Sequence, residues 1–327
     1  LHRTLMYSCA CPATGRRFRW FSQVCFLAGI SMNRTRASGR TVGGLRTLSL
    51  QAPAVTLLLL WMIVPLGMTI WFSFQRYNLL MPEMTGFAGL ENYEYLLTDP
   101  ALWSAMGTTL LLVGWVLVIT VVGGTLLAVL FQQDFAGRGI ARVLAISPFF
   151  VMPTVSALVW KNMMMHPSNG VLAWLAQSLG LPALDWFSSL PLTSIIIIVS
   201  WQWLPFALLI LLTAMQSLDE DQVEAARMDG AGPLAIFFFI TLPHLKRAIS
   251  VVIMIEMIFL LTIFAEIFVT TSGGPGLATT NLAYLIYIQA LLDFDVGMAS
   301  AGGVIAIILA NIVAIFLVRM VAKNLED

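Results

Sequence analysis

Charged residues are scarce in this sequence. Only 10% of its 327 residues are Asp, Glu, Lys or Arg, whereas 59% are hydrophobic, and the mean hydropathy is +0.89. Soluble domains carry about 25% charged residues, so this composition argues strongly against a water-soluble fold. The 17 basic and 17 acidic side chains balance, and the basic excess expected of a nucleic-acid-binding protein is absent.

Cysteine is also nearly absent. The three cysteines, Cys9, Cys11 and Cys25, all fall within the first 25 residues. The hydrophobic body of the chain therefore contains neither a disulfide framework nor a cysteine-based metal site.

Motifs for nucleotide binding and hydrolysis are missing as well. The sequence has no G-x-x-x-x-G-K-[ST] phosphate loop, no H-E-x-x-H zinc motif and no G-x-S-x-G nucleophile motif. Its histidines, His2, His166 and His244, are far apart in the sequence. We expect no enzyme activity, no metal and no cofactor in this chain, so any reaction it depends on must be catalysed by a partner.

Long apolar runs dominate what is present. About 20 mostly apolar residues are needed to span a bilayer as a helix. Six segments meet this requirement, and the sequence predicts an all-α membrane protein with six transmembrane helices. The segments are residues 50–72, 103–131, 140–160, 193–216, 245–270 and 296–318.

The distribution of basic residues predicts the orientation. Lys and Arg concentrate in cytoplasmic loops. With a cytoplasmic N-terminus, the outer loops carry only Arg76 and Lys161. The inner set is Arg34, Arg36, Arg40, Arg46, Arg138, Arg142, Arg227, Lys246, Arg247, Arg319 and Lys323. We therefore expect the protein in the inner membrane of a bacterial cell. Both termini, and the loop between spans four and five, would lie in the cytoplasm.

The N-terminal residues 1–45 read as a basic, disordered tail, followed by one membrane domain over 46–327. Met32 is a candidate native start, in which case residues 1–31 are an upstream extension that is not native. A basic flank followed by a short apolar run at 16–29 also has some character of a signal peptide, although a tail is the interpretation we prefer.

The loop over residues 217–243 contains helix signals. Ser217 and Glu220 have the spacing of a capping box, and Gly230 is a natural residue just past a helix end. Pro233 suits the first turn of a second helix, and Pro243 would mark the entry to span five. The sequence thus predicts two short helices joined by a sharp turn.

Three residues within the first of these helices are distinctive. Ala225 and Ala226 are small enough for another surface to approach closely, and Asp229 places an acid in the last turn, against the helix dipole. Two interpretations are open: an ordinary solvated loop, or a docking element for a cytoplasmic partner.

The spacing of this segment resembles the EAA motif of ABC-importer permeases. Glu224-Ala225-Ala226, three residues, Gly230, nine residues and then the tetrapeptide 240–243 match it at every fixed position. From about residue 45 the chain resembles the MalF/UgpA-like group of binding-protein-dependent carbohydrate permeases, through stretches such as "GLENYEYLLTDP" and "TTSGGPGLATTNLAYLIYIQAL". The stretch "FAEIFVTTSGGPG" looks most like permeases for sorbitol, mannitol and related polyols.

The resemblance implies a type I ABC-importer permease fold (MalF/MetI-like) with cytoplasmic coupling helices. It implies a second, homologous permease subunit, two nucleotide-binding ATPase subunits that use ATP and Mg, an extracytoplasmic solute-binding protein, and a sugar or polyol as the transported solute. The residues that it assigns to ATPase coupling are Glu224, Ala225, Ala226, Asp229, Gly230, Leu242 and Pro243. The sequence departs from the family at Arg247, where many relatives carry a proline.

Two acidic residues fall inside span five and are candidates for the translocation path. Charged side chains within a membrane are costly and usually functional. Glu256 and Glu266 are ten residues apart, which on one helix places them about 80° apart around the axis. They would flank one broad face and bind substrate hydroxyls, or alternatively pack against a neighbouring helix.

Further candidates come from spans four and six. Trp201, Gln202 and Trp203 offer aromatic faces and an amide, which suit a sugar or polyol, although tryptophans also face lipid. Asn311 would line the path or join helices. Pro205 predicts a kink in span four.

Glycine pairs suggest close packing of helices. Gly123-Gly124 in span two and Gly302-Gly303 in span six carry no side chain, so neighbouring helices can approach closely there.

Two other functions compete with an importer permease. A proton-coupled secondary transporter could use Glu256 and Glu266 as a relay, but it would leave residues 224–243 unexplained. An ABC permease for a non-carbohydrate solute such as glycerol phosphate would be expected to place Lys or Arg in the path, and the sequence shows none in the interior of the spans, away from their cytoplasmic ends.

Overall fold

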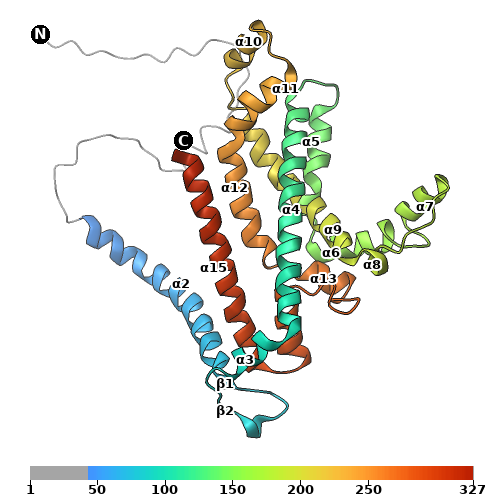
Figure 1. Cartoon of the computed structure of the whole chain (residues 1–327). Coiled ribbons are helices and arrows are strands. Elements are labelled where there is room, and N and C mark those ends of the chain that lie inside the picture. Colours follow the sequence, from blue (N-terminus) through green and yellow to red (C-terminus); the bar gives the residue numbers. More distant parts are fainter. Residues whose placement is uncertain (1–42, 327) are drawn as a thin grey trace, which may run out of the picture. The chain divides into compact units, whose positions relative to one another are not determined.

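The computed structural model of the chain describes residues 43–326 (Figure 1). Nearly all of the predicted tail therefore lies outside the described residues. The chain divides into two units, residues 1–60 and 61–327. The described part of the first unit, residues 43–60, belongs to the helix α2 (Gly43–Ser73), and all contacts reported below lie in the second unit.

The described residues are mostly helical. Their only strands are two short ones, β1 (Gln75–Arg76) and β2 (Gly86–Phe87), which pair antiparallel. After α2, the α-helices are α3 (Glu91–Thr98), α4 (Pro100–Gln132), α5 (Arg138–Ile146), α6 (Pro153–Val159), α7 (Val171–Ser178), α8 (Trp186–Ser189), α9 (Pro191–Met215), α10 (Glu220–Met228), α11 (Pro233–Ile236), α12 (Leu242–Leu260), α13 (Ala265–Thr270), α14 (Leu282–Tyr287) and α15 (Val296–Glu326). Five short 3-10 or π turns complete the list: η1 (Pro82–Met84), η2 (Ser147–Phe150), η3 (Trp160–Met164), η4 (Phe237–Thr241) and η5 (Ile288–Leu292).

Five helical segments are long and apolar enough to cross a membrane, or six if one bent pair of helices counts as a span. The prediction of spans one, two, four and six as helices is confirmed. The five segments are Ala52–Ser73, Pro100–Gln132, Pro191–Met215, Pro233–Leu260 and Val296–Ile315.

The third span is not the continuous helix that the sequence predicted over 140–160. Two helical segments, Arg138–Phe150 and Pro153–Met164, meet at an angle of 107°. Proline disfavours helical geometry in the residue before it, and Met152, which precedes Pro153, is extended with ψ 138°. Val151 is extended as well, so the chain turns sharply at this point.

The fifth span also differs from the prediction of 245–270. A helical run begins at Pro233 and ends at Leu260, and α13 follows as a separate short helix. Pro243 lies in the first turn of α12, where the sequence predicted the entry to the span. The helical run nevertheless extends back to Pro233, because α11 and the π turn η4 lead directly into α12.

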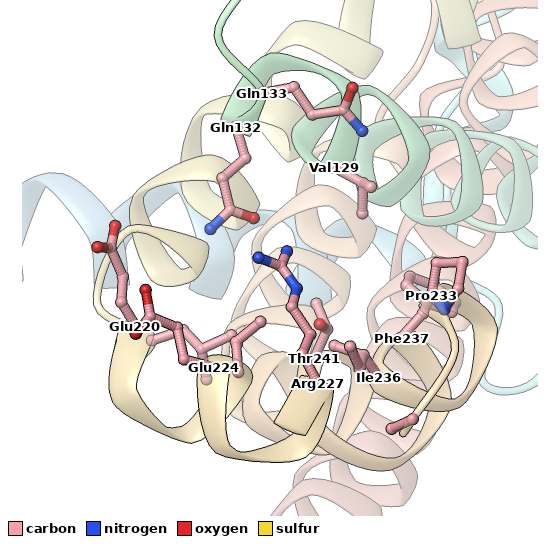
Figure 2. A pocket seen from close by; sticks show the side chains of 13 residues that line it. Val129, Gln132, Gln133, Glu220, Glu224, Arg227, Pro233, Ile236, Phe237 and Thr241 are labelled. Atoms are coloured by element: carbon pink, nitrogen blue, oxygen red, sulfur yellow. The ribbon is translucent and has the colours of Figure 1, made fainter. Parts of the chain in front are cut away.

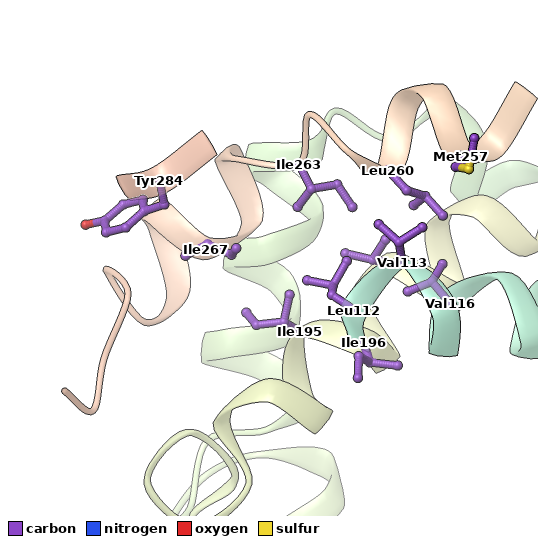
Figure 3. Close-up of a cluster of buried hydrophobic side chains, with 11 residues drawn as sticks. Leu112, Val113, Val116, Ile195, Ile196, Met257, Leu260, Ile263, Ile267 and Tyr284 are labelled. Atoms are coloured by element: carbon purple, nitrogen blue, oxygen red, sulfur yellow. The ribbon is translucent and has the colours of Figure 1, made fainter. Parts of the chain in front are cut away.

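The tightest packing is between α4 and α9, which run side by side. A methyl group added at Gly124 would lie 2.9 Å from the Ala207 Cβ and 3.2 Å from the Leu208 backbone nitrogen. The predicted close approach at this glycine is confirmed. Beyond it, α4, α9, α12 and α14 share an apolar core, in which Leu112, Ile195 and Leu260 are fully or almost fully buried (Figure 3).

The loop between α2 and α4 is held by one buried amide. The Asn92 Nδ2 donates hydrogen bonds to the carbonyls of Ser73 and Gln75, both at 2.9 Å. An exposed hydrogen-bonded ion pair joins Arg76 to Glu91 and raises the pKa of the guanidinium. The buried amide, rather than this exposed pair, is the contact expected to stabilise the loop.

Candidate functional site

The helix α10 begins with a different cap from the predicted one. Asp219 is the N-cap, and its side chain accepts a hydrogen bond from the Asp221 backbone nitrogen at 3.1 Å. The Ser217 hydroxyl instead donates a hydrogen bond to the Ala214 carbonyl, in the last turn of α9, at 2.6 Å. The capping box predicted from Ser217 is therefore wrong, because this serine closes the preceding helix.

The predicted sharp turn at the end of α10 is confirmed. Gly230 has φ +83°, a conformation that glycine adopts without strain. The Gly230 nitrogen donates to the Arg227 carbonyl at 3.0 Å, and the Ala231 nitrogen donates to the Ala226 carbonyl at 2.9 Å, the two hydrogen bonds of a Schellman motif. Asp229 is the C-cap, so its carboxylate lies at the edge of the helix rather than within it.

The second helix begins where the sequence predicted. Gly232 is the N-cap of α11 and Pro233 is its first residue, which costs no hydrogen bond because the first N–H groups of a helix are unpaired. Together, α10, the turn and α11 form an elbow, which Figure 1 shows beside the end of α4 that leads to α5.

The elbow presents the predicted coupling residues on its surface. Glu224, Ala225, Asp229 and Gly230 are exposed, and Ala226 is half-buried. Leu242 is half-buried and Pro243 exposed at the start of α12. Within residues 43–326, Glu224 has no hydrogen bond or ion pair. The carboxylate and the small residues beside it are thus accessible to another molecule.

A hollow of about 530 Å³ lies between the elbow and α4 (Figure 2). Its polar lining combines carboxylates, a guanidinium and amides, and Figure 2 shows Arg227 pointing from α10 toward the end of α4 that carries Gln132. The lining residues are Val129, Gln132, Gln133, Leu218, Glu220, Val223, Glu224, Arg227, Ala231, Pro233, Ile236, Phe237 and Thr241.

Glu256 lies where it cannot reach solvent. Its side chain is fully buried on α12, and the Thr120 hydroxyl of α4 donates to its Oε2 at 2.6 Å. Its Oε1 has no hydrogen-bond partner among the described residues. In this conformation Glu256 connects α12 to α4.

Glu266 does not share a helix face with Glu256. It is buried on α13, which packs against α6 and α9. The prediction that the two carboxylates flank one face of a single helix is wrong, because α12 ends at Leu260 and Phe264 leaves helical geometry with φ −141° before α13 begins.

The three neighbouring residues of α9 point in different directions, since successive helical residues are 100° apart. The Trp201 ring packs edge-on against Trp160, with centroids 5.7 Å apart. Gln202 is buried, and its Nε2 donates to the Val151 carbonyl at the bend of the third span at 3.0 Å. Trp203 packs on Phe259 of α12, with ring centroids 5.3 Å apart.

Asn311 is the remaining predicted path residue. It is exposed on α15, and its Nδ2 donates to the Ile307 carbonyl of the same helix at 2.8 Å. No predicted path residue lines the hollow at the elbow. The helices that carry them are in contact, because α12 packs against α9 and α15, and α13 packs against α9.

Sequence reasoning missed the partners of these groups. The Lys161 ammonium is half-buried and donates to the Val269 carbonyl of α13 at 3.0 Å, which ties the bent third span to α13. Thr120 gave no signal of its own, although a carboxylate inside a membrane always demands a partner. That requirement could have prompted a search for a hydroxyl in span two, but the sequence alone does not identify Thr120 as the partner.

Solved structures share this fold. The chain superposes on one chain in the crystal structure of a bacterial ABC transporter involved in the import of the acidic polysaccharide alginate, with a TM-score of 0.71. The two sequences are 21% identical, and the match covers 87% of this chain and 99% of that chain. The architecture is therefore that of an ABC-importer permease, and the predicted type I fold is confirmed.

Sequence comparison then gives the family. Residues 26–327 match the family of binding-protein-dependent transport system inner membrane components, and the chain belongs to it. A probable ABC transporter permease protein (y4oQ) of Sinorhizobium fredii is 36% identical over 76% of this chain and 81% of its own length. The trehalose/maltose transport system permease protein MalF of Thermococcus litoralis is 32% identical over 79% of this chain and 87% of its own length.

Proposed function

We propose that this membrane component imports a sugar or a polyol and that ATP hydrolysis in partner subunits drives the transport. Relatives with sugar-based names support the solute class. They include the trehalose/maltose permease of T. litoralis and the sulfoquinovosyl glycerol transport system permease SmoG of Agrobacterium fabrum, which is 31% identical over 83% of this chain.

The proposed assembly contains a second, homologous permease, two ATPase subunits that bind ATP and Mg, and an extracytoplasmic binding protein that delivers the solute. The observation that carries this proposal is the elbow. A transporter that works without an ATPase does not require two short helices joined by a sharp turn at its surface. It also does not require exposed small residues beside a Glu224 carboxylate that has no partner among the described residues. We propose that the elbow and both termini face the cytoplasm, in agreement with the distribution of Lys and Arg.

Each coupling residue has a physical role in this proposal. Glu224 forms a polar contact with the ATPase, and Ala225 and Ala226 allow the two surfaces to approach. Gly230 and Asp229 form the turn that fixes the angle between α10 and α11. Leu242 and Pro243 lie where the elbow joins α12, so motion of the elbow would reach the membrane through one continuous helical run.

We propose that the residues predicted for the translocation path have two different roles, contact with the solute and positioning of helices. Trp203 is half-buried and packs beside the exposed Phe259, so these rings can offer a face to the apolar C–H side of a sugar. Glu256 and Gln202 are buried and hydrogen-bonded to other elements. They would act on transport by holding those elements in place rather than by contacting the solute in this conformation.

Uptake into proteoliposomes tests the proposed energy source. The full transporter, with ATPase and binding protein, should accumulate radiolabelled sugar or polyol only when ATP is enclosed with the ATPase. Collapse of the proton gradient at constant ATP should leave the rate unchanged. Immediate loss of uptake under that condition would favour the secondary transporter, with Glu256 and Glu266 as its relay.

Competition tests the solute class. Sugars and polyols should compete for uptake, and ligand screening on the binding protein encoded beside this chain would identify which of them bind. If glycerol phosphate competes and neutral carbohydrates do not, the carbohydrate proposal is wrong, while the ATP-driven mechanism could still hold.

A further inference from the structure

A second hollow lies between α9 and α12, outside the elbow. This α9–α12 groove has a volume of about 700 Å³, within the range of small-molecule sites. Its lining residues are Leu209, Ile210, Thr213 and Ala214 of α9, Ser217 in the turn after α9, and His244, Arg247, Ala248 and Val251 of α12. None of the coupling or path residues is among them.

The groove is polar at one end and apolar at the other. Ser217, His244 and Arg247 form its cationic end, and Leu209, Ile210 and Val251 form its apolar wall. Leu209 lies six residues before the end of α9 at Met215 and Ser217 lies two residues beyond it, so the groove extends about 12 Å along the helix direction. The apolar wall is accessible, because Leu209 is 37% exposed and Val251 is 44% exposed.

The cationic end places a guanidinium beside an oriented imidazole. The His244 Nε2 lies 3.0 Å from the Ala214 carbonyl and 3.2 Å from the Ser217 hydroxyl, and these contacts orient the ring. Arg247 is exposed, and no ion pair or hydrogen bond occupies its guanidinium among the described residues. The nearby Asp219 carboxylate accepts the capping hydrogen bond of α10.

The position of the groove relates its two ends to a bilayer. Both walls belong to helical segments of membrane-spanning length and hydropathy, Pro191–Met215 and Pro233–Leu260. The cationic end lies at the end of α9, next to the polar elbow, whereas the apolar wall lies further along the spans. Basic pockets between transmembrane helices at this level bind anionic lipid headgroups.

We propose that the α9–α12 groove binds an anionic phospholipid. Its phosphate accepts hydrogen bonds from the Arg247 guanidinium, beside the His244 imidazole, and one acyl chain lies along the apolar wall. The guanidinium can hold two phosphate oxygens at once. The site also gives a role to Arg247, which stands just after the EAA motif at the position where many permeases of the family carry a proline. It is independent of the transported solute and of the ATPase.

Native mass spectrometry of the full chain in detergent tests the site. Phosphatidylglycerol and phosphatidylcholine with identical acyl chains are titrated, and the first bound lipid is quantified. Phosphatidylglycerol should bind more tightly. Arg247→Gln should weaken its binding about tenfold, as expected for the loss of a charge-assisted hydrogen bond, and should leave phosphatidylcholine binding unchanged.

The matched control is Lys246→Gln. Lys246 is the neighbouring exposed cation on α12 but does not line the groove, so its loss should change phosphatidylglycerol binding less than twofold. Ala248→Trp should fill the groove and weaken both lipids. Equal unfolding temperatures of the variants would show that folding is intact.

Three results would overturn the proposal. Equal effects of Arg247→Gln and Lys246→Gln would mean diffuse attraction without a site. Displacement of the lipid by inorganic phosphate alone would mean an anion site that does not use the apolar wall. A photo-crosslinker at Val251 that captures the second permease and no lipid, in the assembled transporter, would mean that a subunit covers the groove.

Discussion

A methyl group at Gly124 should separate α4 from α9. The added Cβ would lie 2.9 Å from the Ala207 Cβ and 3.2 Å from the Leu208 nitrogen, both closer than ordinary contact. The Leu208 nitrogen belongs to the backbone of α9, so relief requires the helix to move. Overpacking of this kind costs about 1–3 kcal/mol, and we expect Gly124→Ala to lower Tm by about 2–8 °C.

Two glycines of the same helix provide controls. An added Cβ at Gly123 would lie 2.8 Å from the Leu204 Cδ1, the mobile end of a side chain, so Gly123→Ala should cost less. Gly114 has nothing within 4 Å of the added Cβ, and Gly114→Ala should gain up to about 1 kcal/mol from the higher helix propensity of alanine.

Thermal unfolding of the purified chain in detergent, followed by tryptophan fluorescence, measures the series. The expected order of Tm is Gly124→Ala, Gly123→Ala, wild type, Gly114→Ala, from lowest to highest. If Gly124→Ala unfolds at the same temperature as Gly114→Ala, the packing of α4 against α9 described here is wrong.

Three further predictions follow from single contacts. Thr120→Val removes the hydrogen-bond partner of Glu256 and should destabilise the chain by about 1–3 kcal/mol, measured by the same unfolding assay. Glu256→Gln should cost less stability, because an amide can still form a hydrogen bond with the Thr120 hydroxyl. Equal losses of stability in the two variants would argue against the Thr120 contact. Asn92→Ala removes the donor to two loop carbonyls, and we expect the free energy of unfolding to fall by about 1–3 kcal/mol. Proteolysis in the loop between α2 and α4 should become faster. An unaltered cleavage pattern would contradict the role of Asn92 in holding this loop. Gly230→Val forces a β-branched residue to φ +83°, at a cost of about 1–2 kcal/mol. Amide exchange at residues 230–231 should therefore accelerate, and unaltered exchange would count against the turn.

The apolar runs were enough to predict the membrane helices, because a long stretch without charge has few other stable structures. The errors occurred where local chemistry competes with hydropathy. Pro153 bends the third span, although hydropathy runs on through it, and the π turn before Pro243 extends the helical run in a way that hydropathy cannot signal. Such outcomes depend on the neighbouring helices rather than on the local sequence.

Side-chain partners were the least predictable part of the site. The spacing of Ser217 and Glu220 suits a capping box, yet Ser217 bonds the end of α9 and Asp219 takes over the cap. The glycine at 230 was predictable, because a turn with positive φ selects it. The contact of Glu256 with Thr120 joins residues 136 positions apart, and only the packing of α4 against α12 determines it.

The most direct test of the coupling proposal is ATP-driven uptake by the reconstituted transporter with Glu224→Lys, compared with Asp221→Lys. Both substitutions replace an exposed carboxylate of α10 by an ammonium, but only Glu224 lines the hollow at the elbow. We predict that Glu224→Lys abolishes uptake and weakens co-purification of the ATPase, while Asp221→Lys retains most of both. Undiminished uptake and ATPase binding with Glu224→Lys would contradict the assignment of the elbow as the coupling site.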